Sequence, residues 1–268
     1  MTAPHRTEEL LVSRRDEGAV VEVTFNRPHR HNAFTTVMYE GLRALFAELT
    51  DDRTARVVVF RGAGALAFAA GNEIGEFAEM TEGAQAVAYE GRVRTLLTDL
   101  ARLPQVSIAA IDGLCVGGGL AVASYCDLRL ATASSRFGYP IARTLGNALS
   151  RPLLERCVHV FGESVTRQML LASRLLDARR AYELGALLAV AESRHDLDLE
   201  LDALIAGLLQ AAPTTVRTTK EQLFDITAAA GDIEHDERLL ERAYGSPAFR
   251  EGVRAFLAKE KPDFRSLV

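Results

Sequence analysis

Three consecutive glycines, Gly117 to Gly119, follow an apolar run and open a segment with helical character that continues through Tyr125. The apolar residues 108–111 are typical of a buried strand, so the glycines lie at a strand-to-helix turn. Glycines at a helix start leave backbone N–H groups uncovered, and the helix dipole adds to their attraction for an anion. The turn could therefore bind a phosphate or a developing oxyanion. A tight turn with close packing is the structural alternative.

A second loop, residues 68–74 (Phe-Ala-Ala-Gly-Asn-Glu-Ile), has the same character and follows the apolar run 57–60. If the two loops meet, the N–H groups of Asn72 and Gly118 converge on one carbonyl oxygen. Two donors from two loops form an oxyanion hole. The glycine spacing matches neither the dinucleotide-binding pattern nor a phosphate-binding loop.

Other reactive side chains give weaker signals. His29 and His31 flank Arg30, but no third ligand follows at metal spacing, so no metal site is predicted. No serine or cysteine nucleophile with a paired base is apparent. The cysteines form no C-x-x-C pair, which indicates buried thiols in a reducing compartment, with a catalytic thiol as the alternative. These cysteines are Cys115, Cys126 and Cys157.

Strand-like and helix-like segments alternate through the first 160 residues. Apolar spacing predicts helices over residues 35–50 and 87–100, and strands over 19–25, 57–60 and 106–111. This alternation predicts an α/β fold.

The remainder of the chain has helical periodicity, with breaks at glycine and proline. We therefore divide the chain into an α/β body, residues 1–160, and a helical region, residues 161–268. The helices are expected over residues 163–171, 178–185, 198–211, 214–229 and 235–259.

The composition is that of an ordinary globular protein. The 268 residues include 31 Lys and Arg against 36 Asp and Glu, a net charge of −5, and 48% are hydrophobic. This balance argues against nucleic-acid and membrane partners. Residues 1–10 have no apolar signal core, and no apolar run of membrane-spanning length is present. We expect a cytoplasmic protein.

Several segments, in order along nearly the whole chain, resemble the crotonase (enoyl-CoA hydratase/isomerase) family. The resemblance implies a crotonase-like spiral of ββα units with a helical C-terminal region, residues 161–268, that covers the pocket and assembles the chain into a trimer or a dimer of trimers. It also implies an acyl-CoA thioester as substrate, with no other cofactor. The matching segments are residues 26–28, 32–34, 68–74, 108–113, 117–119, 126–129, 137–140 and 251–264.

The same resemblance assigns roles to the two loops. The N–H groups of Asn72 and Gly118 would hold the enolate oxygen of the thioester. Further substrate contacts are expected from Ala70, Glu73, Ile74, Gly117, Tyr139 and Arg143, and contacts with the CoA nucleotide from His29 and Arg30.

The sequence departs from the family at two positions. Family hydratases carry two glutamates that act as acid and base in water addition; here these positions are Ala121 and Ile141. Loss of one such group costs about 10²–10⁴ in rate. Glu73 matches a position that is usually acidic and is interpreted as structural.

Other groups near the expected pocket could replace the missing glutamates. Glu76 and Glu79 follow the second loop and either line the pocket or lie on a solvated face. Arg143 or Tyr139 is predicted to face the acyl group. An arginine there binds a substrate carboxylate or forms a structural ion pair.

Three functions are compatible with these residues. The first is an enzyme of the hydratase/isomerase type, a lyase or isomerase of fatty acid metabolism. The second is a hydrolase, decarboxylase or C–C bond-cleaving enzyme with the same oxyanion hole. The third is a non-catalytic acyl-CoA-binding protein.

Overall fold

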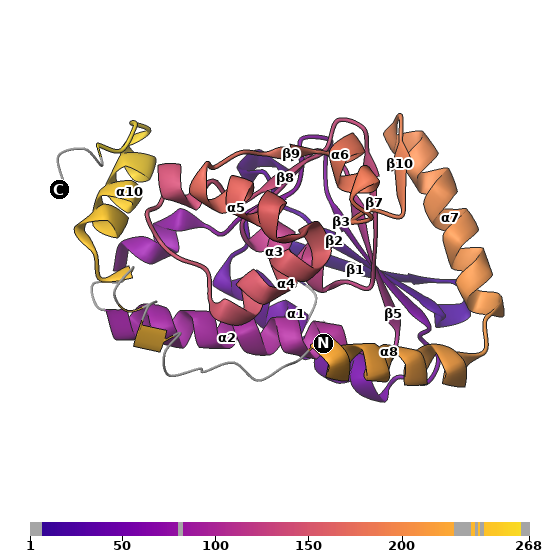
Figure 1. The fold of residues 1–268 in the computed structure, drawn as a ribbon. Helices are drawn as coiled ribbons and strands as arrows, with labels where there is room; N and C mark the ends of the chain where they lie inside the picture. The colour runs from indigo at the N-terminus through magenta and orange to yellow at the C-terminus, as the bar shows by residue number, and fades with distance from the viewer. Residues whose placement is uncertain (1–6, 80–82, 228–236, 239–240, 242–243, 264–268) are drawn as a thin grey trace.

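Two sheets of parallel strands form the body of the protein (Figure 1). The computed structural model describes residues 7–79, 83–227, 237–238, 241 and 244–263. The larger sheet is parallel except for the antiparallel pair β1–β2. Its strands, in spatial order, are β1 (Leu10–Arg15), β2 (Val20–Phe25), β3 (Val57–Gly62), β5 (Val106–Ile111), β7 (Leu128–Thr132) and β10 (Ala189–Ala191).

The smaller sheet alternates with the larger one along the chain. Its parallel strands β4, β6 and β8 each follow a strand of the larger sheet, and a helix follows each pair. This repeat is the expected spiral of ββα units. The strands, in spatial order, are β4 (Ala67–Ala70), β6 (Leu114–Val116), β8 (Arg136–Gly138) and the antiparallel β9 (Leu176–Asp177).

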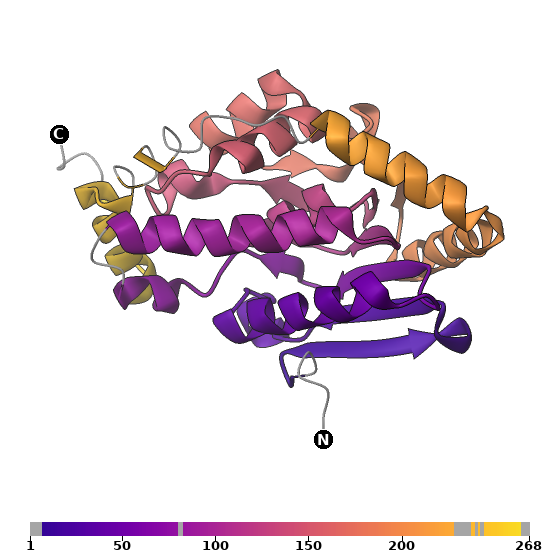
Figure 2. The same ribbon diagram turned by 90° about the horizontal axis from the view of Figure 1, so that it is seen from below.

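Helices surround both sheets. Figure 2 shows α2 crossing the molecule, with α10 near its amino-terminal part and α8 near its other end. The α-helices are α1 (Thr36–Asp51), α2 (Gly83–Arg102), α3 (Gly118–Tyr125), α4 (Arg151–Phe161), α5 (Glu163–Leu171), α6 (Ala178–Glu183), α7 (Arg194–Gln210), α8 (Pro213–Thr227) and α10 (Pro247–Ala258). The 3-10 helices are η1 (Asp16–Gly18), η2 (Pro28–Arg30), η3 (Ile74–Glu79) and η4 (Pro140–Arg143).

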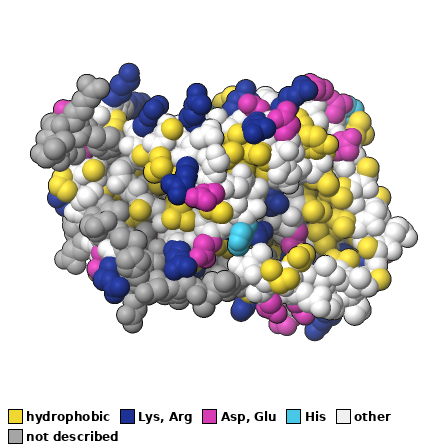
Figure 3. Space-filling model, viewed as in Figure 1, with side chains coloured by type: hydrophobic (Ala, Val, Ile, Leu, Met, Phe, Trp, Pro, Cys, Tyr) yellow, Lys and Arg dark blue, Asp and Glu magenta, His cyan; other side chains and the backbone are white. Residues whose placement is uncertain are grey.

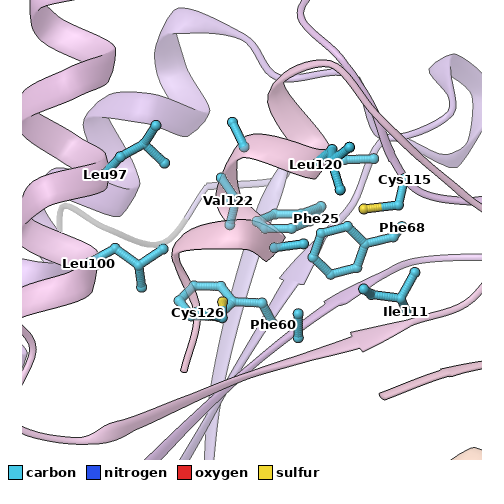
Figure 4. Close-up of a cluster of buried hydrophobic side chains, with 14 of the residues drawn as sticks. Phe25, Phe60, Phe68, Leu97, Leu100, Ile111, Cys115, Leu120, Val122 and Cys126 are labelled. Carbon is cyan, nitrogen blue, oxygen red and sulfur yellow. The ribbon is translucent and has the colours of Figure 1, made fainter. Parts of the chain in front are cut away.

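The main core lies between the sheets and helices α1 to α3. Figure 4 shows Phe25, Phe60 and Phe68 together with Leu120 and Cys115. The ring of Phe25 packs edge-on against Phe68, with centroids 5.3 Å apart. A second core joins the other face of the larger sheet to α7, which explains why β3 and β5 are apolar on both faces.

Charged and hydrophobic side chains are mixed on the face shown in Figure 3, where the hydrophobic ones gather toward α7. None of the described helices combines the length and the apolar character needed to cross a membrane.

The C-terminal part contains two short strands that periodicity did not reveal, β9 and β10. Strand β10 pairs with β7 and completes the larger sheet, so this part contributes to the body. Helices α5 to α8 lie where helices were predicted. Of the helix expected over residues 235–259, α10 is described, and parts of the rest lie outside the described residues.

Candidate active site

The two glycine-containing loops meet at one edge of the smaller sheet. Strands β4 and β6 are parallel neighbours, with Ala70 opposite Val116, so the loops after them leave the same edge. A Cβ placed on Gly117 would lie 3.0 Å from Cα of Gly71. One on Gly118 would lie 2.7 Å from Oδ1 of Asn72. The loops are therefore in direct contact.

The backbone N–H groups of the two candidate donors, Asn72 and Gly118, are not used by the surrounding backbone hydrogen bonds. Gly118 is the first residue of α3, where an N–H has no partner within the helix. Asn72 forms a parallel bridge with Phe34. The N–H of Phe34 donates to the Gly71 carbonyl (2.9 Å), and the N–H of Glu73 donates to the Phe34 carbonyl (2.7 Å). In such a bridge the N–H of the middle residue, Asn72, points away from the partner strand.

Tyr39 of α1 completes this corner of the site. Its hydroxyl donates to Oδ1 of Asn72 at 2.6 Å and lies 3.1 Å from the position of a Cβ on Gly118. Burial raises the pKa of Tyr39, so the phenol stays protonated and remains a donor at neutral pH. The sequence analysis did not identify Tyr39. The available signal was its place in the first turns of the helix predicted over residues 35–50, directly after the segment 32–34.

A cavity of about 250 Å³ opens beside the two loops. Its walls are mainly apolar, from Ile74 and Phe77 of η3 to Phe256 of α10. Ala121 and Ile141, where the resemblance leads us to expect the two hydratase glutamates, also line it. The side chains at these two positions cannot transfer a proton.

A carboxylate that the sequence analysis did not identify lines the same cavity. Glu90 of α2 is only 8% exposed. The hydroxyl of Tyr244 donates to its Oε1 at 2.6 Å, and Nδ2 of Asn147 donates to that hydroxyl at 3.0 Å. The available signal was an acidic residue on the face of a predicted helix that also presents Ala86, Tyr89 and Val93.

Most of the predicted substrate contacts lie in the cavity wall. Ala70, Ile74, Gly117 and Tyr139 line it together with Asn72 and Gly118. The ring of Tyr139 is 1% exposed, and its hydroxyl lies next to the Cys157 thiol. Burial raises the pKa of Tyr139. Its predicted role toward the acyl group stays a prediction.

Arg143 lies elsewhere. It is exposed at the end of η4 and is not among the residues that line the cavity. Its predicted contact with substrate therefore has no geometric support in this structure.

Glu73 is held by two arginines. Nη2 of Arg27 lies 2.9 Å from its Oε2, and Nε of Arg30 lies 3.7 Å from the same atom. Burial acts to raise the pKa of Glu73, but the hydrogen bond from Arg27 and the charges of both arginines lower it overall. Glu73 is therefore an ionised partner in a salt-bridge cluster, in keeping with a structural role.

The remaining candidates are outside the cavity. His29 and Arg30 are exposed on η2, and their contact with the CoA nucleotide stays a prediction. Glu76 accepts hydrogen bonds from the N–H and hydroxyl of Thr36, at the start of α1. The side chain of Glu79 is not among those that the structure describes.

The three cysteines are buried and unbonded. Burial raises the pKa of Cys126 to about 12 and of Cys157 to about 11, and raises that of Cys115 well above its ordinary value. A thiol protonated at neutral pH is a poor nucleophile. Among the residues placed in the structure, no three His, Cys, Asp or Glu side chains gather as metal ligands would.

Comparisons with known proteins identify the family of the chain. The family model "Enoyl-CoA hydratase/isomerase" matches residues 15–266. The chain belongs to the enoyl-CoA hydratase/isomerase family. A "Putative enoyl-CoA hydratase" of Thermus thermophilus is 31% identical over 256 residues, which cover 93% of this chain and 98% of the relative.

Solved structures show the same family fold. An "enoyl-CoA hydratase/ carnithine racemase" from Magnetospirillum magneticum has a TM-score of 0.78 and 34% identity, with 97% of this chain and 96% of the other covered. A methylmalonyl CoA decarboxylase complexed with 2S-carboxypropyl CoA has a TM-score of 0.86 at 23% identity, with coverage of 97% and 98%. At that identity the second likeness shows the fold alone.

Positions 121 and 141, on α3 and η4, carry apolar side chains. Polar side chains reach the cavity from other elements, among them Tyr39 of α1, Glu90 of α2, Asn147 of the loop after η4 and Tyr244 of the segment before α10.

Proposed function

We propose that this protein binds an acyl-CoA thioester and stabilises the enolate form of its carbonyl group. The N–H groups of Asn72 and Gly118 would donate to the thioester oxygen. Preorganised donors of this kind contribute to catalysis because they meet charge as it develops, each at about 10²–10³ in rate. The observation that carries the proposal is the contact between the two loops, with one unused N–H on each.

The reaction that follows differs from hydration by a pair of glutamates. Water addition in the family uses an acid and a base at the positions of Ala121 and Ile141, and both are apolar here. We therefore favour an isomerase- or lyase-type reaction that passes through the enolate without water activation at these two positions.

Several accompanying features are part of the same proposal. His29 and Arg30 would meet the CoA phosphates. The C-terminal helices would assemble the chain into a trimer or a dimer of trimers. No cofactor is needed beyond the CoA of the substrate, and the protein would act in the cytoplasm.

Acetoacetyl-CoA provides a direct test, because its enolate absorbs in the near ultraviolet. We expect binding to lower the apparent pKa of enolate formation, because the hole favours the charged oxygen. Binding without any change in the enolate equilibrium would refute the oxyanion hole.

Crotonyl-CoA tests the second part of the proposal. The wild-type protein should hydrate it poorly, and the double variant Ala121→Glu, Ile141→Glu should gain activity by 10² or more, as expected from restored acid and base groups. Efficient hydration by the wild type would contradict the proposed departure from hydratase chemistry.

A further inference from the structure

The polar cluster of Glu90, Tyr244 and Asn147 has no role in the oxyanion hole, yet it borders the same cavity. Among the described residues that line the cavity, Glu90 is the only carboxylate. A carboxylate that is 8% exposed between apolar walls carries a desolvation cost. Such a group is a candidate for function.

The position of Glu90 is well determined by the elements around it. It lies on α2, on the face that also places Tyr89 and Val93 in the cavity wall. Tyr244, at 4% exposed, donates to it from a segment 154 residues away. Asn147 in turn donates to Tyr244, so the phenol is fixed from both sides.

Close backbone packing keeps these partners in place. A Cβ on Gly146 would lie 2.9 Å from the Ala248 backbone, and one on Gly252 would lie 2.5 Å from the Leu145 carbonyl. The loop that carries Asn147 is therefore pressed against α10, next to Tyr244. Figure 2 shows α10 near the amino-terminal part of α2. The cluster is preorganised before any substrate binds.

Glu90 also acts on the corner that contains the hole. Its charge adds to burial in raising the pKa of Tyr39, whose hydroxyl is hydrogen-bonded to Asn72. Glu90, Asn72 and Gly118 line one cavity of about 250 Å³, so an acyl chain whose carbonyl oxygen meets the two donors would share that cavity with the carboxylate.

We infer that Glu90 is the acid/base group of this site, that it exchanges a proton with the acyl carbon next to the thioester carbonyl, and that Tyr244 is its positioning residue. This inference rests on the proposed function. The C–H bond breaks, its electron pair becomes the enolate with charge on the thioester oxygen, and the proton goes to Glu90. When the proton on Glu90 exchanges with solvent before reprotonation, the same carbon receives a hydrogen from solvent and the acyl chain is otherwise unchanged. With a 3-enoyl thioester, its return to carbon 4 gives the 2-enoyl isomer.

A single carboxylate suits this chemistry. Proton transfer within one acyl chain needs one group that accepts and returns a proton. Hydration needs water activated by one group and a proton supplied by another. The replacement of two glutamates by Ala121 and Ile141 and the presence of one buried carboxylate at Glu90 are consistent with the same reaction.

The test is hydrogen exchange of butyryl-CoA in D₂O, followed by mass spectrometry. The wild type should incorporate deuterium, and Glu90→Gln should be slower by about 10²–10⁴. Asp99→Asn, an exposed acid on the same helix, should exchange at the wild-type rate. Glu90→Gln should still shift the enolate equilibrium of acetoacetyl-CoA, because the N–H donors are unchanged; this also shows that the variant is folded.

Tyr244→Phe tests the positioning role through the pH dependence of exchange. Loss of the hydroxyl that donates to the carboxylate destabilises its anion, so the rising limb of the pH–rate profile should move to higher pH. An unchanged profile would overturn the role of Tyr244.

Exchange at the wild-type rate in Glu90→Gln would overturn the role of Glu90. If the wild type left the acetoacetyl-CoA enolate unperturbed, the oxyanion hole itself would be wrong. The two failures are therefore distinguishable.

Discussion

One substitution, glycine to alanine, should have three different outcomes at Gly91, Gly118 and Gly119, because the added methyl group meets different surroundings. At Gly91, inside α2, no atom lies within 4 Å of the new Cβ. Replacement of a helix-interior glycine by alanine removes unfolded-state entropy worth about 0.5–1 kcal/mol. Gly91→Ala should therefore raise the melting temperature by about 2–3 °C and leave acyl-CoA binding unchanged.

At Gly119 the methyl group would lie 2.1 Å from the Ala69 carbonyl oxygen and 2.8 Å from its Cβ. These are atoms of β4, so α3 or the strand must move. Overpacking of this kind costs about 1–3 kcal/mol and occasionally more. Because the contact is with backbone, we expect the upper end of this range.

At Gly118 the new Cβ meets the ends of side chains: Asn72 Oδ1 at 2.7 Å and the Tyr39 hydroxyl at 3.1 Å. Both can rotate, so stability should change by less than about 1 kcal/mol. The methyl group occupies the space beside the two donors, however, and affinity for the acetoacetyl-CoA enolate should fall by about 10².

Urea unfolding and enolate titration measure the two effects separately. The reasoning would be refuted if Gly118→Ala kept full affinity for the enolate, or if Gly119→Ala unfolded at the same urea concentration as the wild type.

Two further predictions concern stability. The side chain of Lys220 in α8 is 10% exposed and donates to Asp127 Oδ2 at 2.7 Å and to the Gln105 carbonyl at 2.6 Å. Lys220→Met should lower the free energy of unfolding in urea by about 2 kcal/mol, because the Asp127 carboxylate would keep hydrogen bonds from Ser107 alone. A loss below about 0.5 kcal/mol would be evidence against a stabilising Lys220–Asp127 ion pair. The folded-state pKa of Glu73 lies below its ordinary value, so its stabilisation is complete above the unfolded-state pKa and is lost as pH falls through the folded-state pKa. Glu73→Gln should accordingly lower stability by about 1 kcal/mol at pH 7 and by much less near pH 3; equal losses at both pH values would contradict the ion-pair assignment.

Periodicity predicted the elements that have enough residues to show it. Residues 35–50 have apolar positions at helical spacing, and α1 covers Thr36–Asp51. Residues 57–60 and 106–111 are continuous apolar runs, and β3 and β5 are buried on both faces. In these segments the local hydrophobic pattern and the burial in the folded protein favour the same secondary structure.

The short strands could not be predicted in this way. Strand β6 has three residues and β9 has two, and each exists because a neighbouring strand pairs with it. Two or three residues do not establish a period. Strand β10, also three residues long, depends on β7, some 60 positions earlier, for its hydrogen bonds.

The residues of the candidate site also differ in how far the local sequence indicates their position. The contact between the loops of Asn72 and Gly118 could be predicted, because small residues in both loops allow their backbones to approach closely; the role of the two N–H groups as donors stays a prediction. The position of Glu90 in the cavity depends on the orientation of α2 and on Tyr244, 154 residues away. No local pattern contains that contact, and a glutamate inside an amphipathic helix is most often solvated.

The proposed oxyanion donors are backbone groups and the proposed acid/base group is a side chain, and this difference has a chemical consequence. The donors for the oxygen are backbone groups at the ends of β4 and β6, which the sheet fixes and which most side-chain substitutions leave in place. The acid/base group is a side chain that can be lost at one position and gained at another without disturbing those donors. Ala121, Ile141 and Glu90 line one cavity, and under the proposed mechanism they would be an instance of this exchange. A carboxylate on α2 approaches the enolate from a different element than one on α3, so deuterium should enter the acyl carbon on the face that Glu90 reaches. The Ala121→Glu, Glu90→Gln variant, which moves the carboxylate back to α3, provides the comparison, and retention of one configuration in both proteins would show that the position of the carboxylate does not select the face.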